Sequence, residues 1–179
     1  MSSFEAVKET VWDQYGAAIG MLENAIDACP ESLWSVRNSK YPHIEFWYMV
    51  FHTLWWLDYY LDESPDTFRP PAPFTMGELD PAGVYPDRVY TKDEMREYLA
   101  HGREKCRNKI AGMTEEDATR RHNHGKKQDS VLNLHMYSMR HVQHHSAQLN
   151  LMLRQTDGEP PRWVSHAGTP LAGPVKENA

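Results

Sequence analysis

FEAVKETVWDQYGAAIGMLENAIDAC, residues 4–29, is the segment whose pattern indicates the fold class most clearly. Its apolar residues recur every three or four positions, which places them on one face of an α-helix. Ser2 and Glu5 have the spacing of a capping box, and Pro30 predicts where the helix ends. The segment therefore predicts a long amphipathic helix that packs against other helices through Phe4, Val7, Val11, Tyr15, Ala18, Leu22 and Ile26.

Twelve prolines divide the chain into long proline-free windows and short proline-rich stretches. Proline is excluded from helix interiors because it lacks an N–H group and clashes with the preceding turn. Long helices are therefore expected within the three longest windows, residues 1–29, 43–64 and 87–159. The second window predicts a helix from Pro42 to about Leu61, which is apolar nearly all round and suits burial on several sides.

The third window is long enough for two long helices. Thr91 and Glu94 form a capping box at the start of the first of them, which is expected to end at Gly112. A short helical piece is predicted over residues 114–119. The last long helix is predicted from about residue 129 to residue 158.

Four long helices and no convincing strand pattern predict an all-α fold, a four-helix bundle. The connection between the second and third long helices, residues 64–90, is long and proline-rich, so it is expected to cross the end of the bundle or to cover a site as a lid. We expect one bundle domain over residues 1–156. Residues 157–179 are expected to form an irregular Pro/Gly-rich tail, with Trp163 as the candidate that pins it.

Composition excludes several classes of protein. A chain of 179 residues is long enough for one domain that needs no disulfide to fold. Cys29 and Cys106 form no CxxC pair, which excludes a disulfide scaffold and a Cys-rich zinc site. A net charge of −6 disfavours a nucleic-acid binder.

The sequence also predicts a cellular location. The first residues show no basic segment followed by an apolar one, so no signal peptide is expected. The most apolar run, residues 44–61, carries three groups that would be costly at bilayer depth, Glu45, His52 and Asp58. We expect a cytoplasmic protein without a membrane partner.

Histidine is the residue type that suggests chemistry. His141 and His145 lie one turn apart in the last helix, about 40° apart and about 6 Å along its axis, so both rings can point at one place. The apolar residues of this helix centre on the same side, so the pair is expected to face inward. Gln148 lies within about 20° of His141, whereas His144 is about 60° from His141 on the side away from His145 and is interpreted as an outer neighbour.

An HxxxH pair alone is ordinarily explained as two core histidines with hydrogen-bond partners. His52 changes this interpretation because it lies halfway along the second helix among aromatic side chains. A third imidazole completes a three-nitrogen metal site. Three protein ligands leave coordination positions open for water or substrate, which is typical of catalytic rather than structural sites.

Together, His52 and the motif His141-x3-His145-x2-Gln148 resemble the DinB/YfiT-like metalloenzymes. The order of the elements fits over most of residues 1–155. The resemblance implies that His52, His141 and His145 hold a divalent metal. The chain departs from the family pattern at Ser146-Ala147, where members often have Arg-Gly.

Characterised members of that family include transferases and isomerases that use thiols such as bacillithiol, mycothiol or glutathione. The resemblance therefore implies a metal-dependent enzyme similar to the low-molecular-weight-thiol S-transferases, or a hydrolase, with a small-molecule substrate. Three imidazoles do not identify the metal. Zinc or nickel is expected first, and iron, manganese, cobalt and copper stay open. The alternative is a non-catalytic metal- or small-molecule-binding bundle with a structural or sensing role.

The sequence lacks the motifs of two other kinds of metal site. Glu-x-x-His pairs of a di-iron bundle and the HExxH motif are both absent. Glu45 lies about 20° from His52 on an ideal helix. It is interpreted either as a group that supports the metal ligands or acts as a general base, or as an ordinary acidic residue at the start of a helix. Residues 120–127 are interpreted as a solvated basic loop, with docking of an anionic substrate as the alternative.

The second helix has more aromatic residues than one face can bury, which predicts a homodimer face or an apolar substrate pocket. The histidines outside the motif, apart from His144, are interpreted as incidental: His43, His101, His122, His124, His135 and His166.

Overall fold

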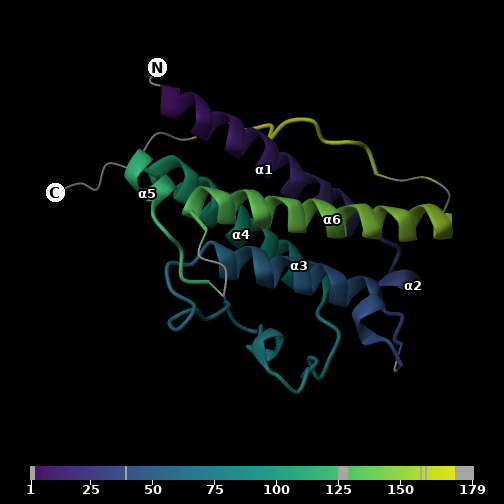
Figure 1. The fold of residues 1–179 in the computed structure, drawn as a ribbon. Helices are drawn as coiled ribbons and strands as arrows, with labels where there is room; N and C mark the ends of the chain where they lie inside the picture. Colours follow the sequence, from purple (N-terminus) through teal and green to yellow (C-terminus); the bar gives the residue numbers. More distant parts are fainter. Residues whose placement is uncertain (1–2, 39, 125–128, 158, 160, 172–179) are drawn as a thin grey trace.

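The computed structural model describes residues 3–38, 40–124, 129–157, 159 and 161–171, and all regular secondary structure in this part is helical (Figure 1). This confirms the all-α prediction. The four long helices are α1 (Ser3–Ala28), α3 (Phe46–Tyr60), α4 (Lys92–Gly112) and α6 (Val131–Asp157). The short elements are α2 (Glu31–Trp34), η1 (Pro42–Ile44), η2 (Gly77–Leu79) and α5 (Glu115–Thr119).

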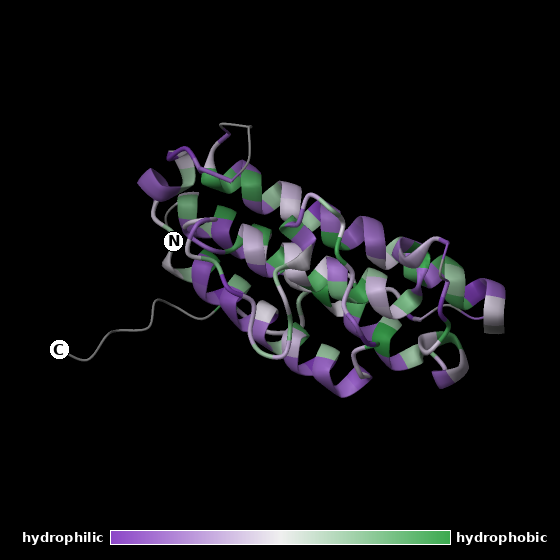
Figure 2. Ribbon diagram, turned by 90° about the horizontal axis from the view of Figure 1, so that it is seen from below, coloured by the Kyte–Doolittle hydropathy of each residue, from purple (hydrophilic) through white to green (hydrophobic). Residues whose placement is uncertain are grey.

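The four long helices pack as a bundle. Helix α6 packs against both α1 and α3, and α4 packs against the same two helices. In Figure 1, α1 and α6 run in one direction and α3 runs in the other. Figure 2 shows hydrophobic and hydrophilic residues alternating along the helices, as expected for helices with one buried face. No helix in the described ranges is both long and apolar enough to cross a bilayer.

The sequence signals located the helix ends well, with one exception. Thr91 and Glu94 form the predicted capping box of α4. The predicted start of the second helix at Pro42 is wrong, because residues 42–44 form a 3₁₀ turn and Glu45 is extended, with φ −68° and ψ 136°. The capping box predicted at Ser2 lies outside the described residues.

The connection between α3 and α4 lies against α3 along its length. Phe68 contacts the ring of Trp55 near the end of α3, and Phe74 stacks on Phe51 in the middle. Tyr90 contacts Trp47 near the start. Helix α3 is therefore covered on one side by helices and on another by this connection, which explains how it buries so many aromatic side chains.

The C-terminal segment, residues 161–171, lies along α1. Gly16 and Gly20 allow a close approach, because a Cβ at Gly16 would lie 2.6 Å from the Cβ of Ala167 and a Cβ at Gly20 would lie 3.2 Å from Val164. The prediction that Trp163 pins this segment is wrong, since that side chain is 71% exposed. Hydrogen bonds to α1 hold the segment instead, because Nε1 of Trp12 donates to the carbonyl of Thr169 and the backbone N–H of Ala167 donates to Asp13.

Candidate metal centre

The three predicted histidines come together where α3 packs against α6. His52 comes from the middle of α3, and His141 and His145 come from successive turns of α6. One ring nitrogen from each lies within 4.8 Å of the others. The ring centroid of His52 is 5.2 Å from that of His141 and 5.0 Å from that of His145. The cluster could therefore hold a metal ion.

Hydrogen bonds orient two of the three rings. Nδ1 of His52 lies 2.7 Å from Oε2 of Glu78, and Nδ1 of His145 lies 2.7 Å from Oε1 of Gln148. Carboxylate and amide oxygens accept hydrogen bonds, so Nδ1 is the donor in both cases. In the neutral ring Nε2 then carries a free lone pair, which is what a metal ligand needs.

The pair on α6 has the separation of two ligands of one ion. Nε2 of His141 and Nε2 of His145 are 3.1 Å apart. Two nitrogens that are each bound about 2.0–2.1 Å from a tetrahedral ion lie about 3.3 Å apart. Burial, followed by the charges of neighbouring histidines, lowers the pKa of His141 to about 3 and that of His145 to about 4. Both rings are therefore neutral at pH 7, and the residues present fit a divalent metal.

Glu78 is the important residue that the sequence did not reveal. It lies in η2, and its side chain is only 5% exposed. Besides His52, the hydroxyl of Tyr48 and Nε1 of Trp56 donate to it, at 2.5 and 2.8 Å. Burial raises the pKa of Glu78, but the hydrogen bonds outweigh it and hold the pKa below its usual value. An ionised carboxylate thus holds the His52 ring.

The other candidates near the triad have different surroundings. Gln148 contacts His145 directly. His144 is exposed, and its ring centroid lies 5.1 Å from that of His145. Glu45 accepts hydrogen bonds from Trp47 and from the segment before α3. Its predicted angle to His52 assumed a helical backbone, and the extended conformation of Glu45 removes that assumption.

The triad is open to small molecules. In the part of the chain that the structure describes, no fourth histidine, cysteine, aspartate or glutamate joins the group. The side chain of His52 is 28% exposed, and the other two rings are partly buried. An ion bound here would keep coordination positions free, as catalytic sites do.

The DinB superfamily model matches residues 14–149 of the chain. The match covers well over half of the sequence and includes all three histidines, so the protein belongs to the DinB superfamily. No curated protein and no solved structure matches the chain. The class established by fold and site is thus a DinB-like bundle whose histidine triad could hold a divalent metal.

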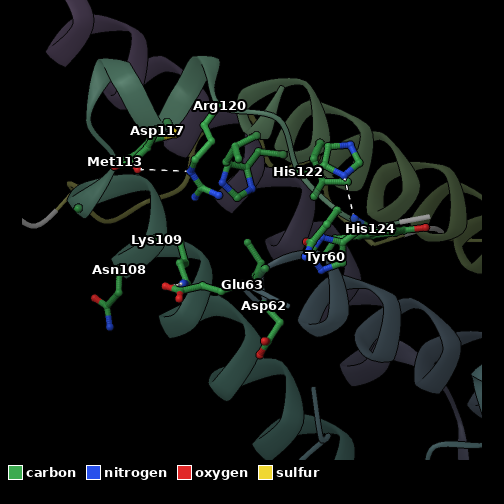
Figure 3. Close-up of a pocket in the computed structure, with 16 residues that line it drawn as sticks. Tyr60, Asp62, Glu63, Asn108, Lys109, Met113, Asp117, Arg120, His122 and His124 are labelled. Atoms are coloured by element: carbon green, nitrogen blue, oxygen red, sulfur yellow. Dashed lines mark hydrogen bonds and ion pairs between the residues drawn. The ribbon is translucent and has the colours of Figure 1, made fainter. Parts of the chain in front are cut away.

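A second group of histidines lines a pocket beside Tyr60, the last residue of α3 (Figure 3). His122, His124 and His135 are all buried. The interpretation of this region as a solvated loop is therefore wrong for His122 and His124, because both side chains are buried and the rings of His124 and Tyr59 form a T-shaped pair with centroids 5.0 Å apart. Residues 125–128 of the predicted loop lie outside the described residues.

His135 should make the fold sensitive to acid. Burial, and then the charges of Lys109 and His124, lower its pKa to about 4. Between pH 6.5 and pH 4 the unfolded chain binds a proton that the folded chain does not, so stability falls as the pH falls. In metal-free protein, His135→Leu should remove up to about 3 kcal/mol of this dependence. Urea denaturation at pH 7, 6, 5 and 4 measures it, and equal slopes for variant and wild type would refute the prediction.

Proposed function

We propose that this protein is a divalent-metal-dependent enzyme that transfers a low-molecular-weight thiol to a small electrophilic substrate. His52, His141 and His145 hold the ion in this proposal. The convergence of three imidazoles from two helices, with two of them oriented through Nδ1, is the observation that carries it. The thiol chemistry itself comes from the resemblance to characterised DinB-like transferases.

A divalent ion held by His52, His141 and His145 would supply the central chemistry, since it would lower the pKa of a bound thiol and so provide a nucleophile at neutral pH. The residues of the chain position the site. Glu78 holds the proton on Nδ1 of His52, and Gln148 holds the proton on Nδ1 of His145. Trp56 fixes Glu78 in turn. Such outer partners tune the basicity of the ligands and keep the rings from turning away.

The open geometry favours an enzyme over a metal-binding bundle with a purely structural role. Structural zinc sites are almost always closed by four protein ligands, whereas the group here contains three among the described residues. The proposal places the enzyme in the cytoplasm, where small thiols are kept reduced.

A thiol panel tests the proposal directly. Glutathione, bacillithiol and mycothiol are each offered with 1-chloro-2,4-dinitrobenzene, and formation of the thioether is followed by absorbance. Protein loaded with zinc or nickel should accelerate the reaction with at least one thiol. Removing the metal with a chelator should return the rate to the uncatalysed value, because the nucleophile is then no longer activated.

The exposed His43 provides the matched control for this assay. His43→Ala should keep both its metal and its activity, whereas His141→Ala should lose both. Turnover that persists in the chelated protein would refute the transferase proposal. Stoichiometric metal with no turnover for any thiol would favour the non-catalytic alternative.

A further inference from the structure

An aromatic cavity of about 540 Å³ lies beside the triad, in the size range of small-molecule sites. Its aromatic residues continue from the metal centre. The ring centroid of Trp56 lies 6.2 Å from that of His52 and 5.3 Å from that of Tyr60, and Tyr60 is 5.5 Å from Tyr137. Trp56, Tyr60 and Tyr137 all line the cavity. An apolar surface therefore leads away from the histidines between α3 and α6.

The helices fix the position of the cavity relative to the triad. Trp56 and Tyr60 follow His52 by one and two turns of α3, which places them about 6 and about 12 Å along the axis. Tyr137 precedes His141 by one turn of α6, about 6 Å. A ligand of one or two rings thus fits along this wall with one end about one helical turn from the histidines.

Arg140 is the charged residue that lines the cavity at its metal end, whereas the carboxylate of Glu78 nearby is taken up by hydrogen bonds from His52, Tyr48 and Trp56. Arg140 lines the aromatic cavity and also a shallower pocket that includes His141 and His144. Within the described ranges, Arg140 makes no ion pair and no hydrogen bond. A guanidinium that has no partner among the described residues and lies next to aromatic walls is suited to a carboxylate or a similar anion, because it offers paired N–H donors.

The opposite end of the cavity has a different character. Asp129 lines it together with His122 and His124. Burial lowers the pKa of both histidines, so the two rings are neutral near pH 7. A carboxylate at this end would be repelled by Asp129, whereas Arg140 would attract it at the other. The charges therefore give an anionic ligand one preferred orientation.

We propose that this cavity is the substrate site, and that it takes a small planar aromatic or unsaturated carboxylate whose anionic group binds Arg140 beside the metal centre. The flat body of the ligand packs against Trp56, Tyr60 and Tyr137. The inference rests on the proposed function, because it assigns the substrate class of the same centre. It makes Arg140 a binding residue that selects for charge.

Calorimetric titration with 2-naphthoate and its neutral analogue 2-naphthamide tests this inference on zinc-loaded protein. Naphthoate should bind the wild type more tightly than naphthamide. Arg140→Gln should weaken naphthoate binding about 10- to 100-fold, the value of one charge-assisted contact, and should leave naphthamide unchanged. Arg140→Lys should restore part of the affinity. Tyr137→Ala should weaken both probes.

Arg154 offers the matched control, because it is another exposed arginine of α6. Arg154→Gln removes the same charge and should bind naphthoate like the wild type. Equal affinity for naphthoate and naphthamide, or normal naphthoate binding by Arg140→Gln, would overturn the inference. A carboxylate held by zinc alone would lose affinity when zinc is removed but not in Arg140→Gln, and this result would also overturn it.

The metal assignment is measured separately in the same samples. Arg140→Gln should retain its zinc, so its loss of naphthoate cannot arise from an empty centre. If zinc proved to bind elsewhere while naphthoate still required Arg140, the proposed function would fail and the anion site would stand. If zinc bound the triad but naphthoate bound Arg140→Gln as tightly as the wild type, only the substrate inference would fail.

Discussion

His145→Ala should reduce the bound metal from about one ion per chain to nearly none at a modest metal excess. Two imidazoles are too few for a tight divalent site, since even catalytic sites keep three protein ligands. His52→Ala and His141→Ala should have the same effect, because the three ring nitrogens lie within 4.8 Å of one another and each would supply one ligand to the same ion. Elemental analysis after desalting measures the stoichiometry for each variant.

His144→Ala is the closest control, because the ring of His144 neighbours His145 but is exposed. It should keep full stoichiometry. Circular dichroism verifies that the triad variants remain folded, which we expect because these partly buried rings lie at the edge of the core. Retention of metal by any folded triad variant would contradict the assignment.

Glu78→Ala should weaken metal binding about 10- to 100-fold, because outer-shell partners of ligating histidines typically contribute that much. It should also lower the free energy of unfolding by about 3 kcal/mol, since three donors lose their shared acceptor: His52, Tyr48 and Trp56. A competition titration with a chelating dye gives the affinity, and urea denaturation gives the stability.

Glu45→Gln separates the two effects of Glu78. Glu45 is also a buried carboxylate that accepts from a tryptophan, but its partners lie at the start of α3. This variant should lose stability and keep its metal affinity. If Glu78→Ala bound metal as tightly as the wild type, the carboxylate would have no role in holding His52 for the ion.

Much of the fold could be predicted because it depends on local signals. The proline-free windows and the Thr91 capping box located the long helices. The start of α3 could not be predicted in the same way. Pro42 is compatible with a first helical turn. However, the side chain of Glu45 accepts hydrogen bonds from the backbone N–H of Asn38 and from the ring of Trp47, and α3 begins only after Glu45, at Phe46.

The triad was predictable because all its members lie in regular helices, where sequence spacing determines direction. That His52 would meet the α6 pair depended on packing between helices, so sequence spacing could not show it; the isolated position of His52 suggested it and the family resemblance implied it. Glu78 had no such signal, because it lies in a connection without periodicity whose path depends on tertiary contacts. The aromatic residues of α3 indicated only that an apolar pocket or a dimer face was to be expected, without its position. No pattern in the sequence indicated a binding role for Arg140.

X-ray absorption at the metal edge of the loaded protein tests the central claim most directly, because it reports the atoms around the ion. With zinc bound at the triad, the spectrum should show three imidazole nitrogens at about 2.0–2.1 Å from the ion, with light atoms completing the sphere. His145→Ala should remove this spectrum. Sulfur ligands at about 2.3 Å, or an unchanged three-imidazole spectrum in His145→Ala, would contradict the claim that His52, His141 and His145 form the metal centre.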